Sequence, residues 1–351
     1  MPEEWPIGAL APEENAPARR AGRDRLSTVR ADFFLDPAER LTEQERALMT
    51  AMLHCLVGDI ADEVRAVLPN VAMAANDEGN LAIVTSLLSA GLLDRLGVVQ
   101  RLLRRADEER IATGARARVG RSDARVIQGL VSHTDGAVAA AAMALIIARG
   151  RRRDRFGQCL LHFDDLPRDE PRILVQSIAA AFRGELVKRA GVAEADRFLS
   201  SASAQLAASH DPGSSLENLT ATLVRLLDEE GDLDDELIGA AGVEGEMNFI
   251  GHALARRSGI AGDTALDELL SGDSNRVMAL LRMGAVRRET AAGLLAGIGD
   301  LLGIDDPGQA ISRFDRMSDG DVAEALSWLT AGPAYKHAVA ALEAADGQRT
   351  L

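Results

Sequence analysis

The sequence predicts an all-α protein, and three observations lead to that prediction. Ala and Leu supply most of the apolar residues, aromatic residues make up only 3% of the chain, and strand-like runs rich in Val, Ile, Tyr and Phe are absent. Ala and Leu are strong helix formers, whereas strands favour β-branched and aromatic residues. In addition, an Asp precedes an apolar helical stretch at steps of 30, 28 and 34 residues, at Asp77, Asp107, Asp135 and Asp169.

A repeat of this length is typical of stacked helix pairs. We therefore expect HEAT-like antiparallel helix pairs that form an α-solenoid, followed by a second helical sub-domain. Residues 1–18 are rich in Pro, Glu and Ala and predict a disordered tail. Residues 19–209 predict the helical-repeat domain, the run HDPGSS predicts a linker at 210–215, and residues 216–345 predict the C-terminal sub-domain.

The elements of the first half follow from apolar residues at helical spacing between caps and breakers. Thr42 and Glu45 form a capping box, and Pro37 and Pro69 are breakers. Each predicted helix is about three turns long and apolar on a broad face, so it must stack on its neighbours. The predicted helices are 19–35, 42–57 leading through Asp59 into 60–68, 78–89, 92–105, 107–119, 124–131, 137–149, 153–163, 169–189 and 191–209.

The second half is predicted to be helical throughout. A weak internal match pairs Phe249 with Val277 and Leu254 with Leu281, which suggests that the helix-pair repeat continues past the break. The predicted helices are 216–227, 234–241, 247–257, 265–270, 275–283, 289–302, 308–317, 321–329 and 334–344.

Charge and hydropathy exclude several classes of protein. The net charge of −15 argues against a basic nucleic-acid binder. The two Cys residues make no disulfide framework, and the N-terminus lacks the basic and apolar regions of a signal peptide. The longest apolar run, residues 137–148, is shorter than the roughly 20 residues that span a bilayer. We expect a soluble, cytoplasmic protein.

The arginines between residues 95 and 155 are the least ordinary polar feature, because this stretch holds 14 Arg and only 6 acidic residues. On a stacked array such residues align into a positive stripe that would bind an acidic or phosphorylated protein segment. The alternative is a solubilising role, since the whole chain has only two Lys. The predicted surface comprises Arg101, Arg104, Arg105, Arg116, Arg118, Arg121, Arg125, Arg151, Arg152 and Arg153.

Other candidate residues have a plainer explanation. His54 would be a phospho-acceptor if its ring were exposed beside an orienting carboxylate, but a histidine at the edge of the core explains it as well. Cys159 and His162 share a predicted helix face, and with Cys55 and His54 they would form a zinc site of poor geometry. We therefore predict no catalytic residue, no cofactor and no metal site.

Five segments resemble a bacterial family catalogued as domain of unknown function 2336. They are LHCLVGDIADEVR at 53–65, IATGARAR at 111–118, LVSHTDGAV at 130–138, LDDEL at 233–237 and FIGHALA at 249–255. The resemblance covers roughly residues 20–340. It implies a helical, HEAT-like architecture in a soluble bacterial protein, and it supplies no catalytic residues to transfer.

From these features we expect a non-enzymatic regulatory or scaffolding module that binds a protein partner through its helical surface. Two enzyme-like alternatives are a phosphorelay component that uses His54 and a helical-repeat DNA glycosylase that uses the arginine stripe for phosphates. Nucleic acid is not the expected partner, because no aromatic residues lie among the arginines. In a further alternative, the stripe docks on the chain's own acidic half, where residues 205–351 hold 25 acidic and 11 basic residues.

Overall fold

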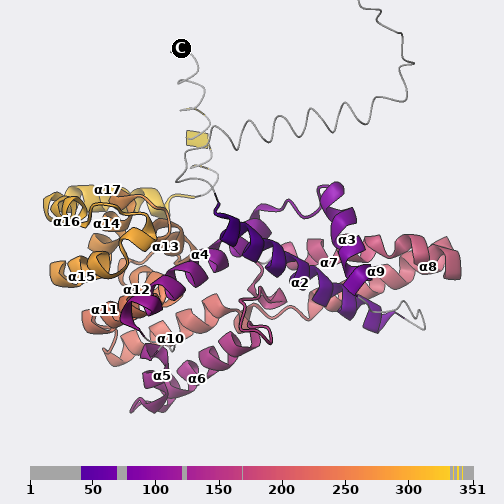
Figure 1. Ribbon diagram of the computed structural model, residues 1–351, viewed down its shortest axis with the longest axis horizontal. Helices are drawn as coiled ribbons and strands as arrows, with labels where there is room; N and C mark the ends of the chain where they lie inside the picture. The colour runs from indigo at the N-terminus through magenta and orange to yellow at the C-terminus, as the bar shows by residue number, and fades with distance from the viewer. Residues whose placement is uncertain are drawn as a thin grey trace, which may run out of the picture. The chain divides into compact units, whose positions relative to one another are not determined.

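The computed structural model describes residues 41–68, 77–120, 125–167 and 169–332, and also residues 335, 338, 339 and 342. Within this part of the chain every regular element is a helix, and an isolated antiparallel bridge joins Arg153 to Cys159 (Figure 1). The all-α prediction is confirmed there. The predicted tail, the predicted helix 19–35 and nearly all of the predicted helix 334–344 lie outside the described residues.

The first half contains long helices that alternate with short ones. Their bounds are α2 (Glu43–Val67), α3 (Asp77–Ser89), α4 (Leu96–Val119), α5 (Val126–Gly129), the 3₁₀ turn η2 (Leu130–Ser132), α6 (Gly136–Arg151), η3 (Phe163–Asp165), α7 (Glu170–Ala181), α8 (Arg183–Ala190) and α9 (Val192–Ala208).

The second half consists of shorter helices whose ends fall within about one turn of the predicted ends. They are η4 (Pro212–Ser214), α10 (Leu216–Glu230), α11 (Asp235–Glu244), α12 (Met247–Ser258), α13 (Gly262–Leu269), α14 (Ser274–Met283), α15 (Arg288–Ile298), η5 (Asp300–Leu302), α16 (Pro307–Arg316) and α17 (Asp319–Thr330).

The prediction that Asp107 caps a helix is wrong. That residue lies inside α4, which is one continuous helix where two were predicted, and its carboxylate accepts a hydrogen bond from Arg110 Nη2 at 3.1 Å. The residues around it are Glu and Arg, which favour helix, so the helix continues. Asp135 does cap α6, since its side chain accepts from the amides of Ala137 and Val138. Asp169 precedes α7 but makes no capping hydrogen bond.

The predicted helix 153–163 is also wrong. This segment is a tight turn closed by the bridge between Arg153 and Cys159. The carboxylate of Asp154 accepts from the amides of Phe156 and Gln158, both at 2.8 Å, and this bonding competes with helix formation. Gly157 has a φ of +82°, a left-handed conformation that glycine adopts without steric cost. The predicted helix 169–189 is likewise divided, into α7 and α8, at Phe182.

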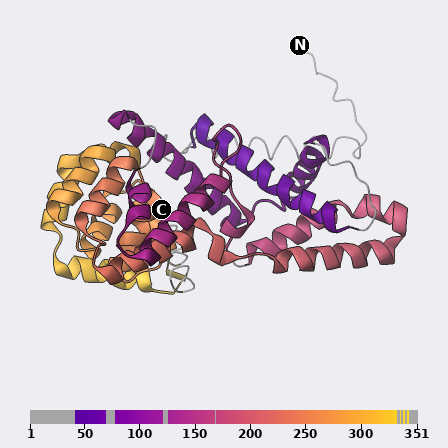
Figure 2. The same ribbon diagram turned by 90° about the horizontal axis from the view of Figure 1, so that it is seen from below.

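Helix α4 takes part in two separate hydrophobic cores. Its residues Val98, Leu102 and Ala106 belong to the N-terminal core, which also includes buried residues of α2, α3, α7, α8 and α9. Its residues Ile111 and Ala115 belong to the C-terminal core, built from α5, α6 and α10–α16. Figures 1 and 2 show the orange and yellow helices of the C-terminal core gathered beside α4, apart from the pink α8 and α9. One helix therefore joins the two cores, and the polar residues between its apolar segments lie at their junction.

Candidate functional site

A buried ionic cluster lies at the junction of the two cores, and Arg105 of α4 is at its centre. Its side chain is 1% exposed, and it donates to Glu217 Oε1 at 2.8 Å and to Glu108 Oε2 at 2.6 Å. Glu217 lies in the first turn of α10, 112 residues away in the sequence. These carboxylates outweigh the effect of burial and raise the pKa of Arg105 further above its ordinary value, so the guanidinium stays charged.

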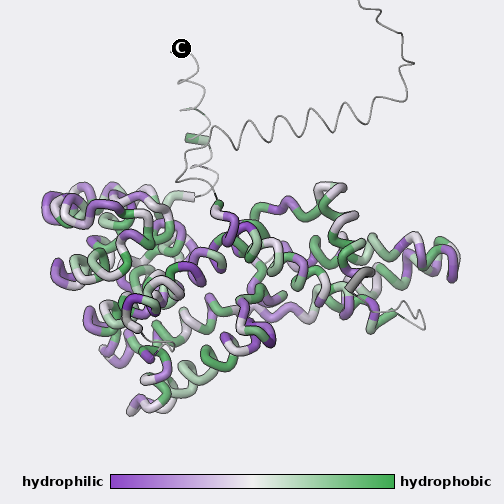
Figure 3. The backbone as a smooth tube through the Cα atoms, viewed as in Figure 1, coloured by the Kyte–Doolittle hydropathy of each residue, from purple (hydrophilic) through white to green (hydrophobic). Residues whose placement is uncertain are grey.

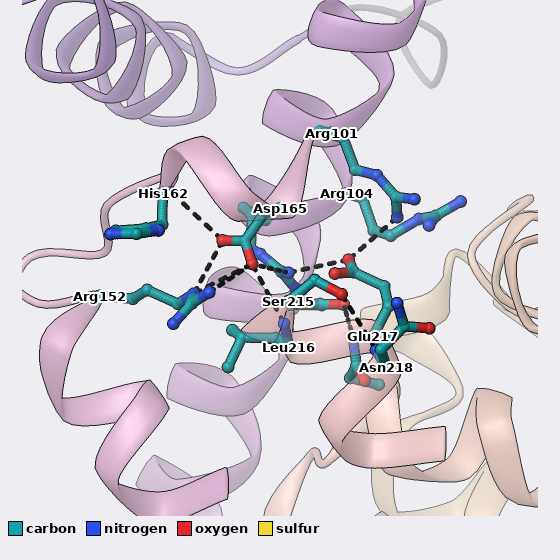
Figure 4. A network of polar contacts seen from close by, with 12 residues as sticks. Arg101, Arg104, Arg152, His162, Asp165, Ser215, Leu216, Glu217 and Asn218 are labelled. Carbon is teal, nitrogen blue, oxygen red and sulfur yellow. Dashed lines mark hydrogen bonds and ion pairs between the residues drawn. The ribbon is translucent and has the colours of Figure 1, made fainter. Parts of the chain in front are cut away.

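Asp165 is the second centre of the cluster (Figure 4). Arg152 donates to both of its carboxylate oxygens, at 2.8 to 3.0 Å, and the amide of Leu216 donates to Oδ1 at 3.1 Å. The carboxylate is fully buried. Burial favours its neutral form, but Arg105 and Arg152 outweigh burial and hold the pKa of Asp165 below its ordinary value. The short η3 turn is thereby fixed to α6 and α10.

Two further arginines of α4 extend the cluster to α13. Arg101 donates to Glu217 at 2.9 Å and to Asp263 Oδ2 at 3.0 Å. Arg104 donates to Asp263 Oδ1 at 2.6 Å and to Asp267 at 2.8 Å. Burial again opposes ionisation, and the two guanidinium groups overcome it and keep the pKa of Asp263 low. We call these residues the junction cluster: Arg101, Arg104, Arg105, Glu108, Arg152, Asp165, Glu217 and Asp263.

An open cavity of about 570 Å³ lies beside the junction cluster. It lies where α4, α5, α6, α10 and the start of α12 meet, and its lining contains five arginines and three glutamates. Its lining residues are Arg105, Glu108, Glu109, Ala112, Arg116, Ile127, Gln128, Ile146, Arg149, Arg152, Arg153, Gly157, Cys159, Leu216, Thr220, Gly245, Glu246, Met247 and Asn248.

Three buried polar atoms of the cavity lining have no hydrogen-bond partner within the part of the chain that the structure describes: Arg105 Nε, Thr220 Oγ1 and Asn248 Oδ1. Thr220 is fully buried and Asn248 is 7% exposed. The amide nitrogen of Asn248 donates to Glu108 Oε1 at 3.2 Å, which leaves its oxygen as the free acceptor. Buried polar groups in proteins are nearly always paired. This part of the cavity lining, which we call the floor, therefore contains both donors and an acceptor that lack partners among the described residues.

Three partly exposed arginines form the other part of the cavity, which we call the rim. Arg149 pairs with Glu246 at 2.6 Å, and Arg153 pairs with Glu109 at 2.8 Å. Arg116 lies 3.9 Å from the same Glu109, and its Nε donates to the carbonyl of its own helix. Three guanidinium groups thus share two carboxylates, and the rim carries one uncompensated positive charge.

Cys159 also lines the cavity. Burial raises the pKa of its thiol to about 11, so the thiol is protonated near neutral pH. A protonated thiol is a poor nucleophile and a poor metal ligand. Cys159 therefore contributes a small apolar surface to the cavity.

The structure divides the predicted arginine surface into buried and exposed members. Arg101, Arg104, Arg105 and Arg152 are buried in the junction cluster, and Arg116 and Arg153 face the cavity. The rest do not gather with them. Arg118 is exposed and pairs with Asp300 at 2.8 Å, the side chains of Arg125 and Arg151 are exposed, and Arg121 lies outside the described residues.

The candidate histidine and cysteine residues also occupy separate places. His54 is half-buried on α2 and makes no hydrogen bond or ion pair with the described residues. Cys55 is exposed, and Cys159 and His162 do not share a helix. In the described ranges, no group of three His, Cys, Asp or Glu side chains is placed to hold a metal ion. None of the helices described there is long and apolar enough to cross a membrane.

Sequence reasoning missed Thr220, Glu217 and Asn248. A signal was present for Asn248, because it interrupts the apolar run Met247–Ala255, all of which is buried. A polar residue inside such a run needs a specific partner. Thr220 and Glu217 carry no comparable signal, since they lie in an ordinary amphipathic helix.

The searches of curated proteins and of solved structures find no match. Residues 115–324 match the family described as an uncharacterised protein conserved in bacteria (DUF2336). The match starts within α4 and includes the C-terminal core through α16. Of the five segments that carry the resemblance, the first, 53–65, lies before it. The match covers more than half of the chain, and the chain therefore belongs to the DUF2336 family.

Proposed function

We propose that the chain is a cytoplasmic, non-enzymatic regulatory or scaffolding module that binds proteins through a HEAT-like repeat surface. The order of contacts in the C-terminal core supports the repeat arrangement. Helix α12 contacts α13, α13 contacts α14, and α14 contacts α16 and α17. Contacts between near neighbours in sequence are typical of arrays in which each helix pair stacks on the next.

The outer face of α6 is the observation that carries the proposal. The opposite face, with Val138, Ala142 and Leu145, is buried, and α6 contacts α10. Figure 3 shows α6 green to pale green along most of its length. Terminal helices of repeat arrays ordinarily have a polar outer face, and an exposed apolar one marks a binding surface. The exposed residues of this face carry no charge: Ala137, Ala140, Met143, Ala144 and Ile147.

The occupant that best fits this face is a second copy of the chain. Asp135 caps the N-terminal end of α6, and the exposed Arg151 ends the helix. The two residues are equally far from Met143 in the sequence. Antiparallel packing of α6 on α6 of a second copy would therefore place each Asp135 near the other Arg151. The dipoles of the two antiparallel helices would attract each other. A two-fold contact of this kind is self-complementary.

The enzyme-like alternatives gain no specific support. Arg101, Arg104 and Arg105 are paired with carboxylates and buried, which disfavours a glycosylase that reads phosphates with them. Their pairing with Glu217 and Asp263 supports an intramolecular use, within the acidic half of the chain. For a phosphorelay, no carboxylate among the described residues pairs with His54 to orient its ring.

Sedimentation velocity over a concentration series tests the proposal. We expect the full chain to form a dimer, and Ile147→Glu to weaken it by at least about tenfold, because a charge would be buried without a partner. Val243→Glu is the matched control, since Val243 is 48% exposed on α11 and Ile147 is 50% exposed. A chain that remains monomeric at every concentration, or a dimer that both variants weaken equally, would contradict a contact through α6.

A further inference from the structure

We propose that the cavity beside the junction cluster binds an organic phosphate of about nucleotide size. Its volume of about 570 Å³ lies within the range of roughly 300–1,000 Å³ that is usual for small-molecule sites. Five helices and the turn after α6 contribute side chains to it, so the site is built from segments far apart in the sequence. The proposal is independent of the contact through α6.

The rim selects a phosphate. Arg116, Arg149 and Arg153 come from three different segments and face one cavity, where two glutamates hold them. A monoanionic carboxylate would only replace one of these glutamates. A phosphate monoester carries up to two negative charges and three acceptor oxygens, and it is recognised by the forked donors of arginine. The uncompensated positive charge at the rim favours that dianion.

The floor requires more than a phosphate. Asn248 Oδ1 needs a donor, while Arg105 Nε has a hydrogen to donate and the hydroxyl of Thr220 can do either. These donors and this acceptor suit a ligand whose non-phosphate part carries a carbonyl, an amide edge or a hydroxyl group. The partly buried Ile146 adds apolar surface for a ring.

Isothermal titration calorimetry on the full chain tests the site with three probes: 5′-AMP and 5′-GMP, their parent nucleosides, and inorganic phosphate. We expect at least one nucleotide to bind more tightly than its nucleoside and more tightly than inorganic phosphate. If no nucleotide binds, the proposal is overturned. If inorganic phosphate binds as tightly as the nucleotides, the floor has no role and the proposal is overturned as well.

Substitutions in the two parts of the cavity locate the binding. Arg149→Gln and Arg153→Gln should each weaken nucleotide binding by about tenfold or more, the size expected for one charge-assisted hydrogen bond. Arg183→Gln is the control, because Arg183 makes a comparable exposed ion pair with Asp196 but does not line the cavity. Equal affinity in all three variants would exclude the rim as the phosphate site.

Thr220→Val separates binding from folding. The hydroxyl has no hydrogen-bond partner among the described residues, so its removal should leave the melting temperature unchanged or raise it. Binding of the nucleotide should nevertheless weaken several-fold, because the ligand loses a hydrogen bond. A variant that melts like the wild type and binds the nucleotide equally well would exclude the floor.

Discussion

The two hydrophobic cores are assembled in different ways. The C-terminal core takes most of its residues from α10–α16, which follow one another in the chain. The N-terminal core combines two separated stretches, 52–106 and 161–202, with α5 and α6 between them in the sequence. The junction cluster between the cores is ionic, and its arginines are buried, although the Asp263 carboxylate is half-exposed. The comparison shows that one chain uses local apolar packing for a core and long-range ion pairs for the junction that α4 crosses.

This difference predicts where the molecule is most sensitive to a single change. An apolar core can relax partly around a smaller side chain. A buried charge that loses its partner keeps its full desolvation cost. The junction cluster should therefore tolerate substitution less well than either core. Without it, the two cores should unfold independently, each with its own free energy of unfolding.

The largest effect is expected for Arg105→Met. Glu217 and Asp165 would lose a buried countercharge, at a cost of about 3–5 kcal/mol. Urea denaturation followed by circular dichroism measures the loss. In the wild type, the amides of α2 and α12 should exchange in one common unfolding reaction. In the variant, hydrogen exchange should show two separate unfolding reactions, one for each helix. Arg183→Met, in an exposed pair with Asp196, should unfold like the wild type, and equal effects in the two variants would remove the distinction between junction and surface.

The next effect is a pH dependence that originates at His252 of α12. Burial is the main cause that lowers the pKa of His252 to about 4. The charges of Asp263 and Glu108 oppose this shift, and those of Arg104 and Arg101 reinforce it. The ordinary pKa in the unfolded chain is about 6.5, so the unfolded state binds the proton first as the pH falls. Stability should therefore decline between pH 6.5 and pH 4, by about 3 kcal/mol.

Denaturation at a series of pH values checks this dependence. In His252→Gln the slope between pH 6.5 and pH 4 should decrease by about one proton. The low pKa values of Asp165 and Asp263 act in a different window, since their stabilisation is lost only below the ordinary Asp value of 3.8. An unchanged slope in the variant would assign the titration to another group.

A smaller effect is expected from replacing the glycines that end two helices. Gly245 ends α11 against α4, whereas Gly231 ends α10 without such a contact. Gly245 has a φ of +70°, and a Cβ there would lie 2.8 Å from the Cα of Ala112. Gly231 has a φ of +83° and open space around it. Gly245→Ala should thus cost about 2 kcal/mol more than Gly231→Ala, because backbone strain is common to both and overpacking affects only the first. Their unfolding free energies give the comparison, and equal losses would show that α11 can move away from α4.

The smallest effect compares two helix starts that look alike in the sequence. Asp135→Ala removes two capping hydrogen bonds and should cost about 1 kcal/mol. Asp169→Ala removes none and should cost less, since α7 begins without a side-chain cap. Thermal unfolding of the two variants measures the difference. The reverse order would mean that the capping bonds of α6 contribute little.

The helices of the second half could be predicted because their starts carry local signals. The side chains of Ser215, Asp234, Asp273, Asp306 and Ser318 each accept an amide of the following first turn. Helix α4 has no such signal, because Arg95 precedes it without a capping bond. Asp107 was predicted to cap a helix and instead pairs with a nearby arginine, and Asp154 stabilises a turn inside the segment predicted as the helix 153–163.

The candidate site was predicted only in part. The number of arginines drew attention to α4, and four of the predicted arginines line the cavity: Arg105, Arg116, Arg152 and Arg153. Burial could not be read from the sequence, because the partners that bury Arg101 and Arg104 lie on α10 and α13. The distance from Arg101 to Glu217 is 116 residues, and no local pattern reports a pairing of that length. The sequence therefore located the charges without their countercharges.

The 112 residues between Arg105 and Glu217 have a consequence during synthesis. At a translation rate of about 5–20 residues per second, α4 leaves the ribosome roughly 6–22 s before the carboxylate that neutralises it. Throughout that interval Ile111 and Ala115 also lack the helices that later cover them. The nascent α4 is then a basic, apolar segment of the kind that chaperones hold, and ribosome pausing between residues 120 and 216 would prolong that exposure.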